Sequence, residues 1–219
     1  MKILSEIMRF VHLTSLKHNI DESHSLGHSM KVLYNAHQIY QNTVHSHPSL
    51  KQQLPIIYSA SVLHDMCDKK YMNPYEGIKE INQLLSDKMG HSEILFTKQI
   101  IQTMSYSTVK KYGYPSLGKY QMAYHIVREA DLLAAYDVDR SIIYHMHKTN
   151  GNFTESYQNA LDLFETRVFK HDDDQLFITE YSKMKSREYH KHALSQIHSW
   201  KYIVQNYDAD YFSMGMRNV

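Results

Sequence analysis

Four polar residues interrupt apolar helical patterns in this sequence, and all four are residue types that bind metals. His28 lies in SHSLGHSMKVLYNA, His64 and Asp65 follow the apolar run PIIYSASVL, and Asp131 lies within VREADLLAAYD. At helical spacing, His28, His64 and Asp131 each fall one turn from an apolar neighbour, so they point near the core. A chain that buries such groups without partners is destabilised. Two imidazoles and two carboxylates together suit a hydrated divalent cation.

Each of these residues also has a simpler interpretation when it is taken alone. A buried histidine can bond a backbone carbonyl, and Asp131 can pair with Arg128 or Arg140. One metal ion, however, satisfies all four groups at once, so we expect a single divalent metal site. The mixed donor set favours no one metal strongly. We expect Mn²⁺, with Mg²⁺, Fe²⁺, Ni²⁺, Co²⁺ or Zn²⁺ as alternatives.

The elements that carry these residues are expected to be helices. The chain of 219 residues has only 7 Gly and 4 Pro, and its apolar residues recur mostly at spacings of three and four. This pattern predicts an all-α fold, a single-domain helical bundle over residues 1–219. Helices are expected at about 2–17, 24–43, 52–66, 74–87, 91–105, 118–135, 137–149, 154–168 and 174–206.

Turn-forming stretches separate these helices, and none of them has the length or the composition of a linker between domains. They are HSHPSL, MNPYEG, KYGYPSLG and TNGN. The acidic run HDDDQ at 171–175 is expected to cap the helix over 174–206 and not to bind metal. The basic, amphipathic segment at 182–203 is expected to cover the core, although it could instead dock a partner. The helices from about 137 to 206 would thus complete the bundle.

Composition limits the partners and the compartment. A formal net charge of +1 provides no sequence-wide field for binding long nucleic acid or a membrane. The single cysteine, Cys67, excludes an internal disulfide framework and fits a reducing compartment. No apolar stretch approaches the roughly 20 residues that a bilayer span requires. We therefore expect an intracellular, cytoplasmic protein with a small-molecule partner.

The order of these motifs resembles the HD superfamily of metal-dependent phosphohydrolases. The similarity is greatest to its small bacterial branch, with SHxxxHxxRV, then LHDxxDxK, then DADxLDA followed by an arginine. The corresponding stretches here are SHSLGHSMKV, LHDMCDKKY and READLLAAYDVDR, within about residues 20–140. The resemblance implies a helical bundle of the HD type. It also implies that His28, His64, Asp65 and Asp131 are the metal ligands.

This sequence departs from the family pattern at three positions without losing an expected ligand. Lys31 replaces the usual arginine, Glu129 replaces the first aspartate of DAD, and Leu132 replaces the arginine that usually follows it. HD proteins with two metals carry extra histidines between the dyad and the last aspartate. His91 and His125 are available there but match no such motif, so the expectation of one metal is kept.

The resemblance also implies roles for the neighbouring polar residues. Asp68 is a candidate to orient or deprotonate the attacking water, and Lys70, or Lys69 in its place, to bind a phosphate. Arg140 matches the family arginine and is expected to bind phosphate or to pair with an aspartate. His24 is expected either to donate a proton to the leaving group or to support a neighbouring ligand. Alternatively, Asp68 and His24 could be solvated surface residues without a catalytic role.

The family branch implies a nucleotide substrate, with release of phosphate or pyrophosphate from a nucleoside triphosphate or a related nucleotide. Tyr71, Tyr106 or Tyr136 could stack on a base, although tyrosines in helical bundles more often serve packing. A second hypothesis is a phosphodiesterase that acts on a cyclic nucleotide or a nucleic acid end. A third is a regulatory module that binds a nucleotide without turnover.

Overall fold

The computed structural model describes residues 2–215, and the side chains of residues 3–206. These residues form helices and no strand, so the all-α prediction is confirmed. The α-helices are α1 (Lys2–Lys17), α2 (Leu26–Thr43), α3 (Leu54–Leu63), α4 (Pro74–Leu85), α5 (His91–Thr103), α6 (Tyr106–Tyr112), α7 (Gln121–Ala134), α8 (Val138–Lys148), α9 (Phe153–Thr166) and α10 (Glu180–Gly215). Short 3₁₀ helices are η1 (Glu22–His24), η2 (Pro48–Gln53), η3 (Gly118–Tyr120) and η4 (Val168–Lys170).

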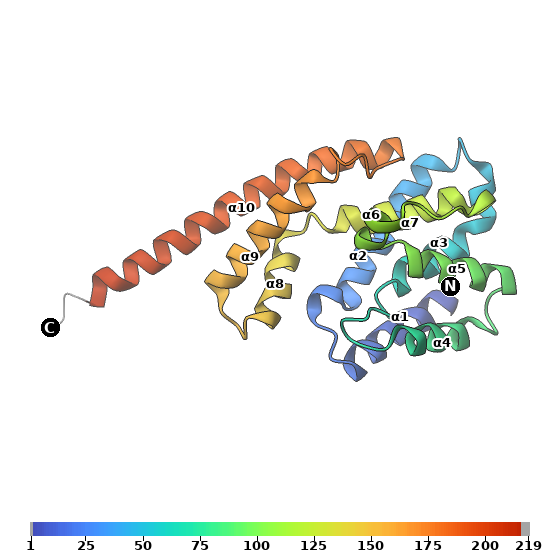
Figure 1. Ribbon diagram of the computed structural model, residues 1–219, viewed down its shortest axis with the longest axis horizontal. Helices are drawn as coiled ribbons and strands as arrows, with labels where there is room; N and C mark the ends of the chain where they lie inside the picture. The colour runs from blue at the N-terminus through green and yellow to red at the C-terminus, as the bar shows by residue number, and fades with distance from the viewer. Residues whose placement is uncertain (1, 216–219) are drawn as a thin grey trace.

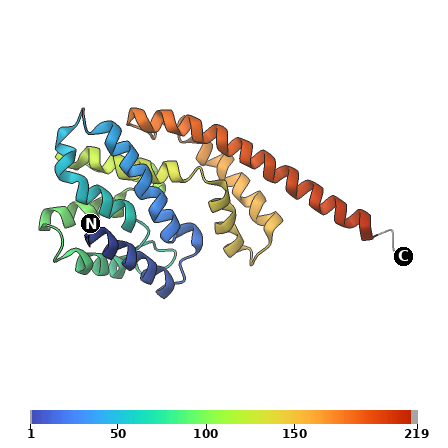
Figure 2. The same ribbon diagram turned by 180° about the vertical axis from the view of Figure 1, so that it is seen from behind.

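Helices α2, α3 and α7 form the centre of the molecule and contact one another pairwise. Helices α1 and α5 pack on α3, α10 lies across α7 and α2, and α8 pairs with α9 beside them (Figures 1 and 2). The central helices are apolar because they are covered on most sides. Their fully buried side chains include Val32, Ala36 and Ile39 of α2, Ile57 and Ala60 of α3, and Ile126, Val127 and Ala130 of α7.

Two charged residues of α7 are buried because they hold the chain that leads into α10. The Glu129 side chain is fully buried and accepts hydrogen bonds from the Ile178 amide at 2.7 Å and from Thr179 Oγ1 at 2.6 Å. Arg128 lies 3.6 Å from Glu129 and donates to the Leu176 carbonyl. Buried polar groups are tolerated when they are paired in this way. This docking gives Glu129 a structural function away from the predicted ligands.

The same contacts explain why the prediction for residues 171–175 was wrong. These residues form turns, and α10 begins only at Glu180, not at 174. Thr179 caps the helix, because its Oγ1 accepts from the Ser182 amide at 3.3 Å. Gln175 has a φ of 53°, which stops a helix from continuing through the acidic run. The acidic run therefore does not cap the helix.

The other helix predictions hold to within a few residues, with four exceptions. Helix α10 continues to Gly215, beyond the predicted end at 206. Helix α6 was missed, because seven residues are too few to reveal a periodic pattern. The helix expected over 52–66 is divided into η2 and α3, and it ends at Leu63. His24 lies in η1 and not in α2, which begins at Leu26.

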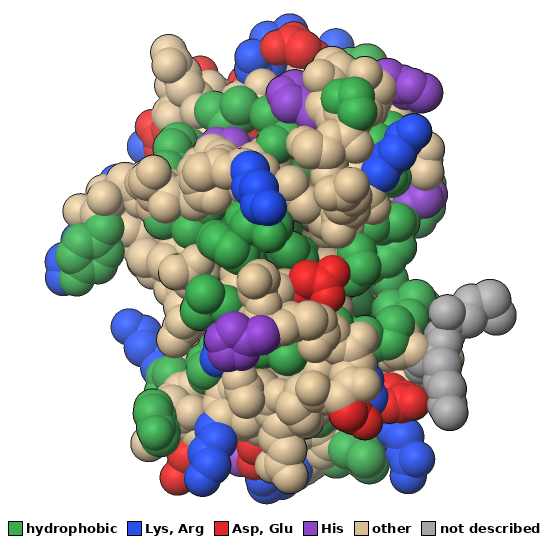
Figure 3. Space-filling view, turned by 90° about the vertical axis from the view of Figure 1, so that its right-hand side faces the viewer, with side chains coloured by type: hydrophobic (Ala, Val, Ile, Leu, Met, Phe, Trp, Pro, Cys, Tyr) green, Lys and Arg blue, Asp and Glu red, His purple; other side chains and the backbone are tan. Residues whose placement is uncertain are grey.

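Charge is mixed on the face shown in Figure 3, where basic and acidic side chains are scattered among hydrophobic ones. Helix α10 extends beyond the other helices (Figure 1). Among the described residues, none of the helices combines the length and the apolar composition needed to span a membrane.

Gly77 lets α4 lie directly on the turn that follows His64 and Asp65. A Cβ atom at this position would be 2.7 Å from the Met66 carbonyl oxygen and 2.8 Å from the Cys67 Cα. Both of these neighbours are backbone atoms, which cannot rotate away as a side chain can. A glycine is therefore required where α4 crosses this turn.

We predict that Gly77→Ala lowers the free energy of unfolding by about 1–3 kcal/mol, because overpacking displaces the turn. Urea denaturation followed by circular dichroism measures the change. Gly27→Ala is the matched control, since Gly27 is an exposed residue of α2 and nothing lies within 4 Å of an added Cβ. That control is expected to be neutral or slightly stabilising. Equal stabilities for the two variants would contradict the proposed close approach.

Candidate metal centre

The packing of three helices brings the four predicted ligands to one place. His28 lies in the first turn of α2, His64 is the residue at which α3 ends, and Asp65 follows it in a turn. Asp131 lies in the last turn of α7. Because α3 stops at His64, the two adjacent side chains are not held 100° apart around a helix, and both can face one point.

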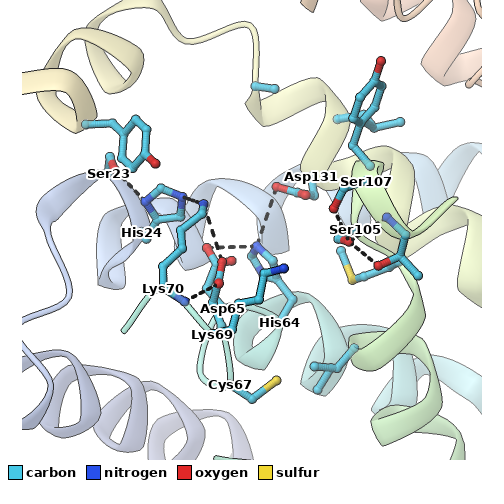
Figure 4. A pocket seen from close by; sticks show the side chains of 18 of the residues that line it. Ser23, His24, His64, Asp65, Cys67, Lys69, Lys70, Ser105, Ser107 and Asp131 are labelled. Atoms are coloured by element: carbon cyan, nitrogen blue, oxygen red, sulfur yellow. Dashed lines mark hydrogen bonds and ion pairs between the residues drawn. The ribbon is translucent and has the colours of Figure 1, made fainter. Parts of the chain in front are cut away.

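The ligand atoms lie close together, and Figure 4 shows three of the four residues, His64, Asp65 and Asp131. Nε2 of His28 is 3.1 Å from Nε2 of His64, 3.4 Å from Asp65 Oδ2 and 3.3 Å from Asp131 Oδ1. Nε2 of His64 is 3.3 Å from Asp65 Oδ2 and 3.6 Å from Asp131 Oδ1. The imidazoles are almost fully buried, whereas the side chains of Asp65 and Asp131 are 13% and 28% exposed. The cluster is thus reached from the carboxylate side.

The backbone fixes the tautomer of His64. Its Nδ1 lies 2.9 Å from the Ser61 carbonyl oxygen, to which it can only donate a proton. In the neutral ring this leaves the lone pair on Nε2, the atom that faces the cluster. Nδ1 of His28 is buried and has no hydrogen-bond partner among the described residues.

The cluster is anionic at neutral pH. Burial alone would raise the carboxyl pKa values, but the two histidines hold the pKa values of Asp65 and Asp131 below their ordinary range. Burial and the charge of Arg140 lower the pKa of His28 to about 4. Burial would also lower the pKa of His64, but the two aspartates raise it well above its usual value. Two carboxylates thus face at most one imidazolium.

This donor set fits a divalent cation. Ligand atoms of His28, His64 and Asp65 all lie within 4.8 Å of one another. The Oδ2 atom of Asp65 is buried and lacks a hydrogen-bond partner among the described residues. The simpler pairings of Asp131 do not occur among them, because Arg128 pairs with Glu129 and Arg140 donates from Nε to the Ser23 carbonyl. A cation would supply the missing partner.

The cluster lies in the wall of a cavity of about 890 Å³ that also receives basic side chains from several elements. This volume is within the range of small-molecule sites, roughly 300–1,000 Å³. The basic residues that line it are Lys69, Lys70, Arg140, Lys148 and Arg167. The cavity can therefore receive an anion beside the cluster.

Three further predicted residues follow the dyad, and two of them, Asp68 and Lys70, lie together in this cavity. The Asp68 carboxylate accepts from the Lys70 amide at 2.9 Å and lies 3.5 Å from its Nζ. Lys70 Nζ is also 3.4 Å from Nε2 of His24. Lys69 is exposed at the cavity edge. The structure thus places Lys70 between a carboxylate and an imidazole.

A network that the sequence did not reveal holds His24. Asp21 accepts from the hydroxyls of Ser23 and Tyr71. Those hydroxyl oxygens lie 2.7 Å and 3.0 Å from Nδ1 of His24, and since their protons point to Asp21, Nδ1 must donate to them. Burial alone would raise the pKa of Asp21, but His24 and the hydroxyls of Ser23 and Tyr71 keep it below its ordinary value. Nε2 of His24 is thereby directed at Lys70 (Figure 4).

The other residues named from the sequence do not all reach this cavity. The hydroxyl of Tyr71 is bonded to Asp21, and Tyr136 lines a separate small cavity, so of the three tyrosines only Tyr106 lines the large one. Cys67 lines the large cavity, but burial raises the pKa of its thiol to about 12. Among the described residues, His91 and His125 belong to no group that could hold a metal.

Comparisons with known proteins show the fold and leave function open. A crystal structure of a Lactobacillus plantarum protein, determined as a structural genomics target, is similar with a TM-score of 0.66 and 18% sequence identity. The similarity covers 97% of this chain and 98% of that one. No protein-family model and no curated protein matches the sequence.

We predict that adding MnCl₂ to metal-free protein raises its melting temperature, because a ligand that binds only the folded state adds about 2.7 kcal/mol at 100 times its Kd. Asp131→Asn should lose most of this shift, since a charged ligand is removed. Asp173→Asn, which changes an exposed aspartate of the turn before α10, is the matched control and should retain it. An unchanged shift in Asp131→Asn would contradict the assigned ligand.

His125 provides a prediction about pH. Burial and the charge of Arg128 lower its pKa to about 4, so the unfolded chain takes up a proton here, near pH 6.5, before the folded protein does. Stability is therefore lost as the pH falls from about 7 toward 4. Between pH 7 and pH 5, wild type should lose roughly 1–2 kcal/mol more than His125→Phe in urea denaturation. His91→Gln, at an exposed histidine, should follow wild type; equal losses in all three proteins would contradict this.

Proposed function

We propose that this protein is a metal-dependent phosphohydrolase of the HD type that acts on a nucleotide. The observation that carries the proposal is the anionic cluster of His28, His64, Asp65 and Asp131 in the wall of a cavity lined by basic side chains. A cation would bind at the anionic cluster, and a phosphate would bind beside it at the basic side chains. The order of the motifs supports the assignment to the HD superfamily. The similarity to a solved structure concerns the fold alone and adds nothing on function.

The four ligands would hold the metal ion at the end of α3, between the first turn of α2 and the last turn of α7. A divalent ion bound by this set supplies Lewis-acid activation of a phosphate and of a water molecule, with Mn²⁺ as our preferred ion. Because the two aspartates raise the pKa of His64, its Nε2 would lose a proton as the ion binds, while Nδ1 keeps its bond to the Ser61 carbonyl.

The basic side chains bind and orient the substrate. Lys70 and Arg140 are linked to the cluster through its neighbours and its ligands. Lys70 pairs with Asp68, and the charge of Arg140 lowers the pKa of His28. Arg140 uses Nε to bond the Ser23 carbonyl, which leaves its other guanidinium nitrogens for a phosphate oxygen. Lys69 can add a further contact from the cavity edge.

Two groups handle protons. Asp68 lies in the same turn as the ligand Asp65, and its carboxylate can accept a proton from the attacking water. His24 presents Nε2 to the cavity and, in its imidazolium form, can give the Nε2 proton to the leaving oxygen, while Asp21, Ser23 and Tyr71 hold its ring. In this proposal the base and the acid come from two different segments that both line the cavity.

The uncharged part of the cavity lining suits a nucleoside. It is built from apolar residues of α4 and α5 and from the hydroxyl-bearing start of α6: Pro74, Ile78, Ile101, Ser105, Ser107 and Thr108. Uncharged groups of this kind can pack against a base or a sugar and bond its polar edges. We therefore favour a nucleotide over a small inorganic phosphate compound.

The decisive experiment is a substrate panel with Mn²⁺ that compares nucleoside triphosphates, monophosphates, cyclic nucleotides and short oligonucleotides. We predict phosphate or pyrophosphate release from a nucleotide, reduced roughly 100-fold or more in His64→Ala and Asp65→Ala because the ligand set is broken. Circular dichroism should show wild-type helicity, and Asp173→Asn should be fully active. Variants as active as wild type would refute the site. Tight nucleotide binding without any product would instead indicate a binding module.

A further inference from the structure

Arg167 is a charged residue of the cavity wall that belongs to none of the motifs. It follows the last residue of α9, where a φ of −136° and a ψ of −59° end the helix before η4. Its side chain is partly buried, and this burial lowers the pKa of the guanidinium. The guanidinium carbon lies 4.3 Å from the centre of the Tyr106 ring, so the group is stacked on α6.

The guanidinium of Arg167 has no ion pair or side-chain hydrogen bond to any of the described residues, unlike those of three other arginines. Arg128 pairs with Glu129, Arg140 donates to the Ser23 carbonyl, and Arg187 donates to Asp172. The nitrogens of Arg167 are not among the buried atoms that lack partners, so solvent reaches them. A partly desolvated cation whose donors face a cavity is suited to an anionic ligand.

Arg167 lies on the same wall as a second basic group. Lys148 and Lys70 both contact the ring of Tyr144, at 4.5 Å and 5.3 Å from its centre. The charges of Asp131, Arg140 and Tyr144 all act on Arg167. Arg140 and Lys148 lie two turns apart on α8, and Lys70 and Arg167 line the same cavity. Such a distribution exceeds what one phosphate group beside the cluster would need.

We propose that Arg167, packed on the ring of Tyr106 and assisted by Lys148, binds a phosphate beyond the one at the metal cluster. The inference rests on the proposed function and narrows it. The substrate then carries at least two linked phosphates, and discrimination against monophosphates and cyclic nucleotides depends on Arg167. The fork of the guanidinium can donate two parallel hydrogen bonds to one phosphate, which a lysine cannot.

The test compares Arg167→Gln with wild type on two substrates in Mn²⁺: a nucleoside triphosphate and p-nitrophenyl phosphate, which has a single phosphate. We expect kcat/KM for the triphosphate to fall roughly 10- to 100-fold, mainly through KM, because charge-assisted hydrogen bonds are lost. The value for p-nitrophenyl phosphate should stay unchanged. Arg167→Lys should recover only part of the loss.

Matched variants separate binding from structure. Arg187→Gln, at an arginine outside the large cavity, should behave as wild type on both substrates. Tyr106→Phe keeps the ring under the guanidinium and should preserve the preference, whereas Tyr106→Leu should weaken it. Equal losses on both substrates, or no loss on the triphosphate, would overturn the proposal.

Direct binding keeps this inference distinguishable from the proposed hydrolysis. Calorimetry with inorganic triphosphate and with orthophosphate measures the preference whether or not the protein turns over any nucleotide. Wild type should bind triphosphate more tightly, and Arg167→Gln should lose that difference while binding orthophosphate as before. A preference that survives in Arg167→Gln would overturn the assignment of Arg167 even if hydrolysis is found. Intact preference in wild type without hydrolysis would refute only the enzymatic proposal.

Discussion

Two imidazole nitrogens and two carboxylates lie against one another in one cluster. This close approach of polar groups constrains the rest of the structure. Their net negative charge opposes burial, so the energy that holds them together must come from elsewhere. The apolar contacts between α2, α3 and α7 provide it, since these helices pack pairwise and their facing side chains are fully buried. A bound cation would then remove the remaining electrostatic cost, which couples metal affinity to helix packing.

The irregular segments matter as much as the helices. The end of α3 at Leu63 frees His64 and Asp65 from helical spacing, and Gly77 lets α4 support the turn that follows. The 3₁₀ helix η1 positions His24 in a similar way. The Asp21 side chain accepts a hydrogen bond from the Ser23 amide at the start of η1 and another from the Tyr71 hydroxyl. Each device fixes a polar side chain through the backbone beside it, and a rigid shell of this kind reduces the reorganisation that binding requires.

Helical periodicity was enough to predict the class of fold, most helix boundaries and the inward direction of His28 and Asp131. The convergence of the ligands was predicted because each residue interrupts an apolar face, a signal that is local in sequence. The roles of Gly77, Asp21 and Arg167 depend on contacts with segments that are remote in sequence or that have no periodic pattern. Helix α6 is too short to show a period, and the start of α10 is set by Glu129, about 50 residues earlier.

Helix α7 links the two parts of the site, because its faces carry different charged groups. Asp131 faces the cluster, whereas Glu129, two residues earlier, binds the amides before α10. That attachment fixes the chain that continues from Arg167 through η4, and Arg128 adds a bond to the Leu176 carbonyl. The motif region at about 20–140 therefore forms the metal cluster but not the whole cavity. Loss of the buried Glu129 contacts would release the C-terminal wall of the cavity while leaving the four metal ligands in place. The affinity for the metal ion and the affinity for the substrate are therefore separable properties of this fold.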